Sequence, residues 1–398
     1  MLDLETALAR LLESLPPPKA ERVPLTASAG RFLAEKICSP LDIPSFDNSA
    51  MDGYAVRATD VRGARAVSPI ALKIAAKIPA GEMFKGELLA GDCARVFTGA
   101  PLPRGSDAVV MQEDTLVVGE RILIFDEPAL GENVRRQGED VKQGDALVEV
   151  GEDLSPGKIA LLAATGVCEI AVGRRPDVAL VATGSELREA GLPLQPGQIY
   201  ESNRAMLSPL ITRCGGVPNV FPLVPDSLEA TRDALQSAFS TSDIVVTSGG
   251  VSVGELDFVK AAFESLRGEL HFWKVAMRPG KPFVFGRLGE KFLFGLPGNP
   301  VSAFVTFLLL VRPAILRWQG ANKTSLPAHP GVLGEALSNT GDRRHFVRVR
   351  EDATGKVFSA GKQASHALCS MAAADGLLDV PPRTTLAIGS SVTVLRWN

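Results

Sequence analysis

Residues 176–320 alternate between short apolar runs and amphipathic stretches, and this alternation restricts the fold more than any other feature of the chain. It predicts an α/β domain with a doubly wound, mostly parallel sheet, since buried parallel strands read as apolar, β-branched runs. The expected strands are Val178–Ala182, Val220–Val224, Ile244–Thr247 and Phe292–Leu296. The expected helices lie near Asn203–Cys214, Ser227–Ser240, Leu256–Leu266 and Asn299–Trp318.

Four unusual loops follow these strands, at residues 183–186, 224–226, 248–257 and 295–302. In an open parallel sheet, ligands bind outside the carboxyl ends of the strands. Loop 248–257 is rich in glycine and serine, which bring backbone N–H groups and hydroxyls close to an oxyanion. It lacks the lysine of a P-loop and the spacing of a dinucleotide motif. These residues are Ser248, Gly249, Gly250, Ser252 and Gly254.

Three of the four loops end in a carboxylate, at Glu186, Asp226 and Asp257. Carboxylates hold divalent cations, so the loops together predict a phosphate or oxyanion site with a divalent cation. Structural alternatives stay open for two of them. Asp226, three residues before Glu229, matches a helix-capping pattern. Asp257, expected in the first turn of the next helix, suits the helix macrodipole.

Other polar positions allow two interpretations each. Asp52 precedes Gly53, which is an ordinary hairpin-turn signal. Pro300 after Asn299 fits the first turn of a helix, although prolines also stiffen a binding loop. Three cations surround the turn at residues 274–281, where they suit an anionic substrate or form a solvated basic loop. They are Lys274, Arg278 and Lys281.

Composition excludes several classes of protein. A 398-residue chain with 45% hydrophobic and 22% charged residues predicts a folded protein of several domains. Its net charge of −3 offers no general basic surface for nucleic acid or anionic membranes. Five scattered cysteines and an acidic amino terminus favour a reduced, cytoplasmic protein, and the four histidines have no metal-ligand spacing. The apolar run Val301–Val311 is shorter than the roughly 20 residues that span a bilayer.

The domain order follows from where these patterns change. We expect residues 1–45 and 141–175 to form one discontinuous amino-terminal domain. Residues 46–140, with short alternating runs between Gly, Pro and Asp, predict an inserted small β domain. The α/β domain covers residues 176–320, and strand alternation in residues 321–398 predicts a carboxyl-terminal β domain.

Several segments taken together resemble the molybdopterin molybdenumtransferase family, which includes MoeA and the gephyrin E domain. The matching segments include FDNSAMDGYAV (46–56), RVFTGAPLPRGSDAVVMQED (95–114), NVRRQGEDV (133–141), TGSEL (183–187), SGGVSVGELD (248–257), WKVAMRPGKPFVFG (273–286) and GLPGNPVS (295–302). The tail segments RRHFVRV (343–349) and QASHALCSMAAADGL (363–377) also fit. The resemblance covers nearly the whole chain and implies the same multidomain fold, with a MogA-like α/β domain.

The resemblance implies insertion of molybdate into adenylylated molybdopterin, with Mg²⁺-dependent release of AMP. It also implies a cytoplasmic homodimer, with the β-domain loops of one subunit near the α/β domain of the other. A transient contact with the molybdopterin adenylyltransferase is expected, and neither nucleic acid nor membrane is an expected partner. Two alternatives remain. One is an adenylyltransferase, whose fold resembles residues 176–320 alone, and the other is a non-catalytic scaffold. A scaffold could lose its acidic residues, and the full set present here favours catalysis.

The resemblance also implies roles for individual residues. The implied catalytic residues are Asp52, Thr98, Asp140, Glu186, Asp226, Asp257 and Lys274, of which Asp226 and Asp257 hold Mg²⁺. The implied binding residues are Ser248, Gly249, Gly250, Ser252, Gly254, Arg278, Lys281, Pro297, Pro300, Arg135, Arg136 and Ser365. Three departures from the usual family pattern concern Arg278, where Lys is common, and Ser185 and Glu201, where Asp is frequent.

Overall fold

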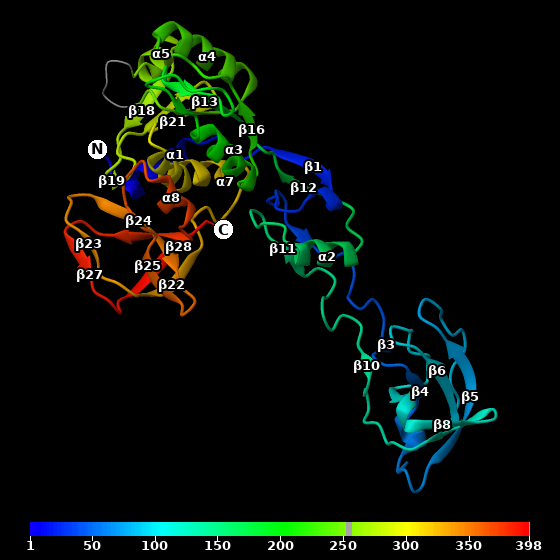
Figure 1. Ribbon diagram of the computed structural model, residues 1–398. Coiled ribbons are helices and arrows are strands. Elements are labelled where there is room, and N and C mark those ends of the chain that lie inside the picture. Colours follow the sequence, from blue (N-terminus) through cyan, green and yellow to red (C-terminus); the bar gives the residue numbers. More distant parts are fainter. Residues whose placement is uncertain (252–256, 398) are drawn as a thin grey trace. The chain divides into compact units, whose positions relative to one another are not determined.

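A computed structural model describes residues 1–251 and 257–397 of the chain (Figure 1). The chain divides into two compact units. The first comprises Met1–Glu35, Val150–Ser155 and Glu169–Asn398, and the second comprises Lys36–Glu149 and Pro156–Cys168. The four domain boundaries expected from the sequence stay a prediction.

The first unit is built on a six-stranded sheet in the order β16-β13-β17-β21-β20-β18. Four neighbouring strands are parallel: β16 (Val217–Val220), β13 (Asp177–Ala182), β17 (Ile244–Ser248) and β21 (Lys291–Leu296). The edge strands β20 (Val284–Leu288) and β18 (Glu269–Trp273) are antiparallel. The predicted mostly parallel sheet is confirmed.

One strand assignment was wrong. We expected a strand at Val220–Val224, but the observed strand, β16, covers Val217–Val220. Beyond it, Val224 forms only an isolated bridge to Thr183. The ladder bonds continue from Phe221 and Val224 to β13, but Pro222 between them has no N–H to donate. A proline therefore interrupts the strand, which its place at the sheet edge tolerates.

Helices cover both faces of this sheet, as expected for a doubly wound domain (Figure 1). Helices α4 (Leu228–Thr241) and α5 (Val259–Ser265) pack on one face through a cluster that includes Leu235 and Phe263. Helices α3 (Asn203–Arg213) and α1 (Leu4–Ser14) contribute to the cluster on the other face, which also contains the helices after β21.

The long helix expected at Asn299–Trp318 is present, and it extends well beyond the apolar run Val301–Val311. Helix α6 (Pro300–Thr306), a π-helical turn (Phe307–Val311) and α7 (Arg312–Trp318) form one continuous stretch of 19 residues. Its length and composition would allow it to cross a membrane, yet 89% of the apolar window is buried inside the protein. We therefore assign it as a core helix.

The carboxyl-terminal residues form a second sheet, in the order β19-β24-β25-β22-β28-β26. Its strands are β19 (Met277–Arg278), β24 (Arg344–Glu351), β25 (Lys356–Ser359), β22 (Ala328–Leu333), β28 (Ser391–Arg396) and β26 (Gly376–Val380). The pair β23 (Leu337–Asn339) and β27 (Thr384–Leu386) and the short helix α8 (Leu368–Ala372) complete it. The remaining strand pairs of this unit are β1 (Ala20–Pro24) with β12 (Glu169–Gly173), and β14 (Leu187–Arg188) with β15 (Ile199–Tyr200).

The second unit contains a sheet in the order β7-β4-β6-β5-β9-β8. Its strands are β7 (Ala108–Met111), β4 (Gly53–Val56), β6 (Asp92–Val96), β5 (Ile70–Ile78), β9 (Arg121–Ile124) and β8 (Thr115–Val118). It also holds the pairs β3 (Asn48–Ser49) with β10 (Val134–Arg135) and β2 (Ile37–Cys38) with β11 (Ala146–Val148), together with helix α2 (Pro156–Ala164).

Candidate active site

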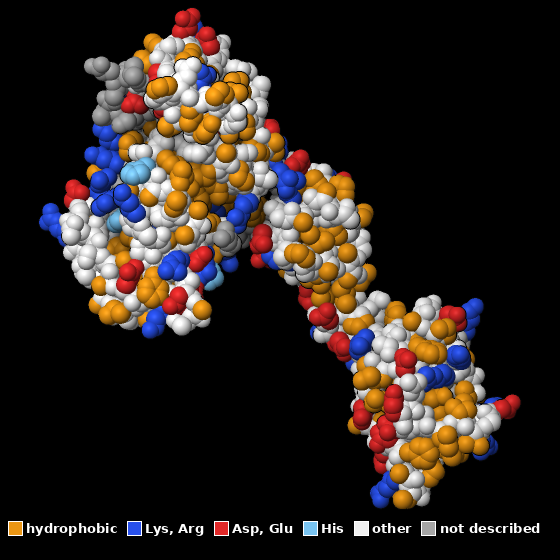
Figure 2. Space-filling model, viewed as in Figure 1, with side chains coloured by type: hydrophobic (Ala, Val, Ile, Leu, Met, Phe, Trp, Pro, Cys, Tyr) orange, Lys and Arg blue, Asp and Glu red, His pale blue; other side chains and the backbone are white. Residues whose placement is uncertain are grey.

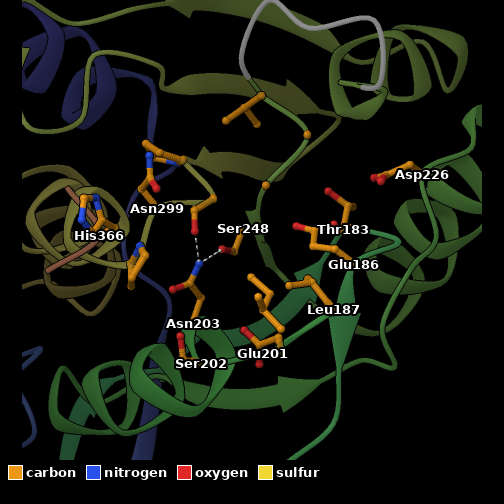
Figure 3. Close-up of a pocket in the computed structure, with 18 of the residues that line it drawn as sticks. Thr183, Glu186, Leu187, Glu201, Ser202, Asn203, Asp226, Ser248, Asn299 and His366 are labelled. Atoms are coloured by element: carbon orange, nitrogen blue, oxygen red, sulfur yellow. Dashed lines mark hydrogen bonds between the residues drawn. The ribbon is translucent and has the colours of Figure 1, made fainter. Parts of the chain in front are cut away.

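A cavity of about 680 Å³ lies at the carboxyl ends of β13, β17 and β21 (Figure 3). Three of the four loops singled out in the sequence line it, and the fourth contributes Asp226. The predicted site residues on its wall are Glu186, Asp226, Ser248, Gly249, Gly250, Asp257, Pro297 and Pro300. The structure therefore brings together residues that are up to 114 positions apart in the chain, from Glu186 to Pro300.

The Ser248–Gly250 turn needs its glycines. Gly249 has a φ of +90° and Gly250 a φ of +66°, in the left-handed region that side chains disfavour. A Cβ on Gly249 would lie 2.6 Å from the Thr183 carbonyl oxygen, and one on Gly250 would lie 2.8 Å from Thr183 Oγ1. The backbone is thus exposed to the cavity without side-chain cover, as expected of an oxyanion loop. Ser252 and Gly254 lie outside the described residues.

Asp226 is not the cap of the following helix. Ser227 occupies the N-cap of α4, and its side chain accepts the Ala230 N–H. Asp226 instead exchanges two hydrogen bonds with Ser185: its Oδ2 accepts the Ser185 N–H at 2.9 Å, and its own N–H donates to Ser185 Oγ at 3.0 Å. The capping interpretation was wrong, and the Asp226 carboxylate is fixed at the cavity wall (Figure 3).

The other two carboxylates differ in their surroundings. Asp257 precedes α5, which begins at Val259 with Phe258 at its N-cap, so its assignment to the first helical turn was also wrong. Glu186 is exposed and, within the described chain, makes no side-chain hydrogen bond or ion pair. Glu186 is thus free to meet a ligand.

The described residues contain no ready-made group of three or more His, Cys, Asp or Glu side chains for a metal. Mg²⁺, however, is commonly held by one or two carboxylates together with water and substrate phosphates. Asp226, Asp257 and Glu186 all line the cavity that holds the oxyanion loop. Carboxylates on the wall of such a cavity are the kind of ligand that this ion uses.

The proline loop forms the wall beside the glycine turn. Pro300 is the first residue of α6 and Asn299 its N-cap, as expected, but the Asn299 side chain makes no capping bond. Pro297 is buried, and the Val301 N–H donates to the Ser365 carbonyl oxygen at 3.1 Å. Ser365 does not line the cavity, although His366 next to it does.

The three cations of residues 274–281 lie outside the cavity lining. Lys274 has a φ of 108°, and its ammonium lies 4.5 Å from the centre of the Trp273 ring. Arg278 is exposed in β19, which pairs with β24, and Lys281 is exposed as well. Figure 2 shows Lys and Arg side chains gathered on this face, where β18 and β19 meet the carboxyl-terminal sheet.

Sequence reasoning missed two buried basic groups next to this face, Arg348 and His345. Arg348 has no exposed surface and no carboxylate partner in the described chain; it donates to Ser370 Oγ at 3.0 Å and to the Lys362 carbonyl oxygen at 2.7 Å. Burial lowers the pKa of Arg348. Burial, with the positive charges of Arg278 and Arg348, lowers the pKa of His345 to about 4. The segment RRHFVRV contained the only signal for them.

Asn203 was missed as well. It lines the cavity at the start of α3, and its Nδ2 donates to Ser248 Oγ at 2.6 Å and to the Gly298 carbonyl oxygen at 2.7 Å. Glu201, noted only as a departure, forms a buried ion pair with Arg204 at 3.1 Å. The fragment Glu201-Ser-Asn203 was the available signal.

The remaining residues to which the resemblance gives a role belong to the second unit. Asp52 Oδ1 accepts the Thr98 N–H at 2.8 Å and its hydroxyl at 2.9 Å, and these bonds lower the pKa of Asp52. The hairpin interpretation of Asp52 was wrong, because β4 begins at Gly53 and pairs with β6 and β7. Gly53 is needed because a Cβ there would lie 2.1 Å from the Val110 carbonyl oxygen.

The two arginines and Asp140 of this unit are exposed. Arg136 pairs with Asp47 at 2.7 Å, so its charge is already partly neutralised. Arg135 lies in β10, and neither its guanidinium nor the Asp140 carboxylate has a hydrogen-bond or ion-pair partner in the described chain.

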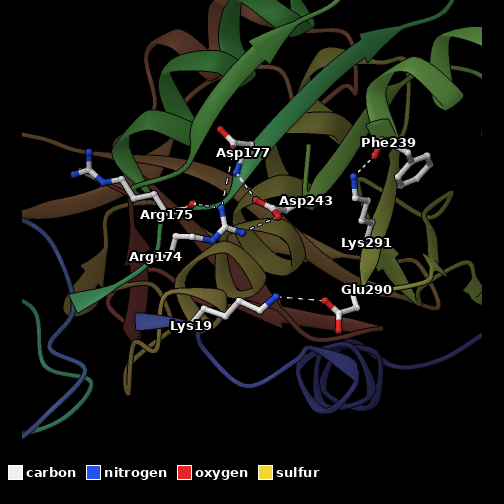
Figure 4. Close-up of polar contacts among 8 residues, drawn as sticks. All are labelled: Lys19, Arg174, Arg175, Asp177, Phe239, Asp243, Glu290 and Lys291. Atoms are coloured by element: carbon white, nitrogen blue, oxygen red, sulfur yellow. Dashed lines mark hydrogen bonds and ion pairs between the residues drawn. The ribbon is translucent and has the colours of Figure 1, made fainter. Parts of the chain in front are cut away.

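A polar cluster fixes the opposite, amino-terminal edge of the parallel sheet in the first unit (Figure 4). Asp243, just before β17, accepts from Arg174 at 2.7 Å and from the Asp177 N–H at 2.9 Å. Lys19 pairs with Glu290 at 3.3 Å, although both side chains are largely exposed. Structural ion pairs thus gather at one edge of the sheet and candidate functional groups at the other.

Comparison with known proteins agrees with this arrangement. Residues 2–166 match the MoeA N-terminal region (domain I and II), residues 179–317 a probable molybdopterin binding domain, and residues 330–397 the MoeA C-terminal region (domain IV). A molybdopterin molybdenumtransferase of Haemophilus influenzae is 40% identical over 406 residues, covering 100% of this chain and 99% of the relative. The chain belongs to the molybdopterin molybdenumtransferase family.

Other members of the family are also similar to this chain over nearly its whole length. A molybdopterin molybdenumtransferase of Nostoc is 38% identical over 94% of this chain and 88% of its own. The crystal structure of a molybdopterin biosynthesis MoeA protein from Pyrococcus horikoshii superposes with a TM-score of 0.86 at 32% identity, covering 100% of both chains. The predicted family, its class as a transferase and the predicted fold class are confirmed.

Proposed function

We propose that this chain is a molybdenum insertase that transfers molybdenum from molybdate to adenylylated molybdopterin and releases AMP in a Mg²⁺-dependent step. One observation supports this most: a single cavity joins a bare glycine turn to three carboxylates. The glycine turn suits the phosphates of an adenylate, and the carboxylates suit the cation that such phosphates need.

We assign the adenylate phosphates to Ser248, Gly249 and Gly250. Asp226 and Asp257 would hold Mg²⁺, whose charge would neutralise the phosphoanhydride as it breaks. Asp226 is suited to this because two hydrogen bonds with Ser185 already fix its position. Glu186 would orient the attacking oxygen; it lines the cavity and has no partner in the described chain.

We assign molybdate to the basic face at residues 274–281, whose next residue, Pro282, lines the cavity. Arg348 carries a buried charge with no carboxylate partner in the described chain. Arg278 and Lys281 are exposed in the turn at residues 274–281. Uncompensated positive charge favours a small dianion over a neutral ligand. Lys274 and Ser365 would complete this side of the site.

The second unit supplies the other implied residues, which are Asp52, Thr98, Arg135, Arg136 and Asp140. We infer that the enzyme is a cytoplasmic homodimer and that these loops complete the cavity of the partner subunit. A transient contact with the adenylyltransferase would deliver the substrate. Light scattering tests the dimer, and a monomer at working concentration would contradict this assignment.

The test of the function uses purified protein, adenylylated molybdopterin and Mg²⁺, with AMP release followed by chromatography. We expect AMP release that depends on both molybdate and Mg²⁺. Substrate binding without AMP release would favour a carrier or scaffold. Consumption of ATP with free molybdopterin would favour an adenylyltransferase.

A further inference from the structure

We propose that Asn203 is a positioning residue that makes the Ser248 hydroxyl a hydrogen-bond donor toward an anionic oxygen in the cavity. This inference rests on the proposed function, since it concerns how the site recognises the phosphate of its nucleotide ligand. Nothing in the comparisons with known proteins assigns a role to Asn203.

The orientation of the Asn203 amide follows from its partners. Its Nδ2 lies 2.7 Å from the Gly298 carbonyl oxygen and 2.6 Å from Ser248 Oγ (Figure 3). A carbonyl oxygen only accepts hydrogen bonds, so the nitrogen of the amide and not its oxygen must face Gly298. Asn203 is only 7% exposed, so its protein partners determine this orientation.

The second N–H of Asn203 determines what Ser248 can do. A serine hydroxyl has one proton to donate, and here its oxygen already accepts from Asn203. Within the residues that the structure describes, Ser248 Oγ donates no hydrogen bond of its own. The Ser248 hydroxyl is therefore left to donate to a ligand, and a ligand oxygen would satisfy it.

The backbone around Ser248 is held firmly enough for this to matter. The Thr183 N–H donates to the Ser248 carbonyl oxygen at 3.0 Å, and the Gly249 N–H donates to the Leu296 carbonyl oxygen at 3.1 Å. Ser248 is itself only 4% exposed. Asn203 thus acts on a hydroxyl that the sheet has already placed, beside the bare turn that would hold the phosphate.

The same amide also holds the proline loop through Gly298. One side chain therefore sets both the donor at the end of β17 and the loop after β21. The occupant that fits is a group that only accepts hydrogen bonds, such as a phosphate oxygen.

The experiment compares AMP with adenosine, which lacks the phosphate, by calorimetry at a temperature where every variant is folded. The variants are Asn203→Ala, Ser248→Ala, the double variant, Asn203→Asp, and Asn219→Ala as a control at an exposed asparagine of β16. We expect Asn203→Ala to weaken AMP binding about tenfold and adenosine binding by less than about twofold. In the Ser248→Ala background, Asn203→Ala should weaken AMP binding less than it does alone, because only the Gly298 contact is left to lose.

Asn203→Asp places an acceptor where the donor was, so it should draw the Ser248 proton away from the ligand and weaken AMP at least as much as Asn203→Ala. Equal losses for AMP and adenosine, or independent losses in the double variant, would overturn the inference. The wild-type release assay separates the two proposals. If the wild type releases AMP and the variants fail this pattern, only the role of Asn203 is refuted. If the wild type neither releases nor binds AMP, both proposals fail.

Discussion

The buried ion pair between Glu201, which lines the cavity, and Arg204 of α3 gives a direct test of what stabilises this side of the cavity. Both side chains are nearly inaccessible, at 5% and 6% exposed, and Glu201 Oε2 lies 3.1 Å from Arg204 Nε. Glu201 Oε1 also accepts the Arg204 N–H at 2.8 Å at the start of α3. Glu201→Gln keeps an acceptor for that N–H and removes only the charge.

The magnitude follows from what remains around Arg204. Removing one member of a buried pair costs about 3–5 kcal/mol, because the other charge is left in a poorly solvated site. Glu189 still lies 2.7 Å from Arg204, so we take the lower end, about 3 kcal/mol. Glu189→Gln is the matched control: it removes the other partner of Arg204, but Glu189 is 53% exposed, so the loss is about 0.5 kcal/mol.

Thermal unfolding followed by circular dichroism measures both variants under the same conditions. At roughly 2 °C for each kcal/mol in a domain of this size, Glu201→Gln should lower the midpoint by about 6 °C and Glu189→Gln by about 1 °C. Equal shifts for the two variants would show that burial does not govern this pair and would refute the reasoning.

Four further changes have defined outcomes. Asp257→Asn should reduce AMP release on the order of 100-fold in a variant that circular dichroism shows to be folded, and normal turnover would exclude its metal role. Gly249→Ala adds a Cβ 2.6 Å from a carbonyl oxygen at a φ of +90°, so it should cost about 1–3 kcal/mol in urea unfolding; no loss would mean that the turn rearranges. Asp52→Ala removes the oxygen that accepts the Thr98 N–H, so exchange of that amide should quicken, and unchanged exchange would contradict the bond. His345 has a folded pKa of about 4, below its ordinary 6.5, so the unfolded chain binds more protons between these values. Stability should therefore fall as the pH drops from 6.5 to about 4, and His345→Gln should remove that part of the slope in urea unfolding.

Local patterns in the sequence were enough to find the sheet and the loops at its carboxyl ends. The apolar runs predicted β13, β17 and β21 to within a residue or two at each end. Because parallel strands end at one edge, the glycine turn at Ser248 and the carboxylates of the neighbouring loops could be expected to meet there. The cavity at this edge agrees with that expectation.

Features that depend on three-dimensional neighbours could not be predicted in the same way. A capping motif assigned Asp226 to α4, but Ser227 takes that position and leaves Asp226 to pair with Ser185, 41 positions away. The role of Arg348 depends on complete burial among carbonyl oxygens from another segment, which no sequence pattern reveals. Asn203 gains its importance only because β17 and β21 end beside α3.

Two of the three departures from the family pattern, Glu201 on the cavity wall and Ser185 next to the wall residue Glu186, have compensations of this three-dimensional kind. Ser185 stands where an aspartate is frequent, so one carboxylate is lost, yet its hydroxyl accepts the Asp226 N–H and its own N–H holds the Asp226 carboxylate. Glu201 is longer than the usual aspartate, and it uses that length to reach Arg204 while still accepting the N–H at the start of α3. Because neither change displaces Glu186, Asp226 or Asp257 from the cavity wall, the acidic groups that the proposed metal step needs are retained.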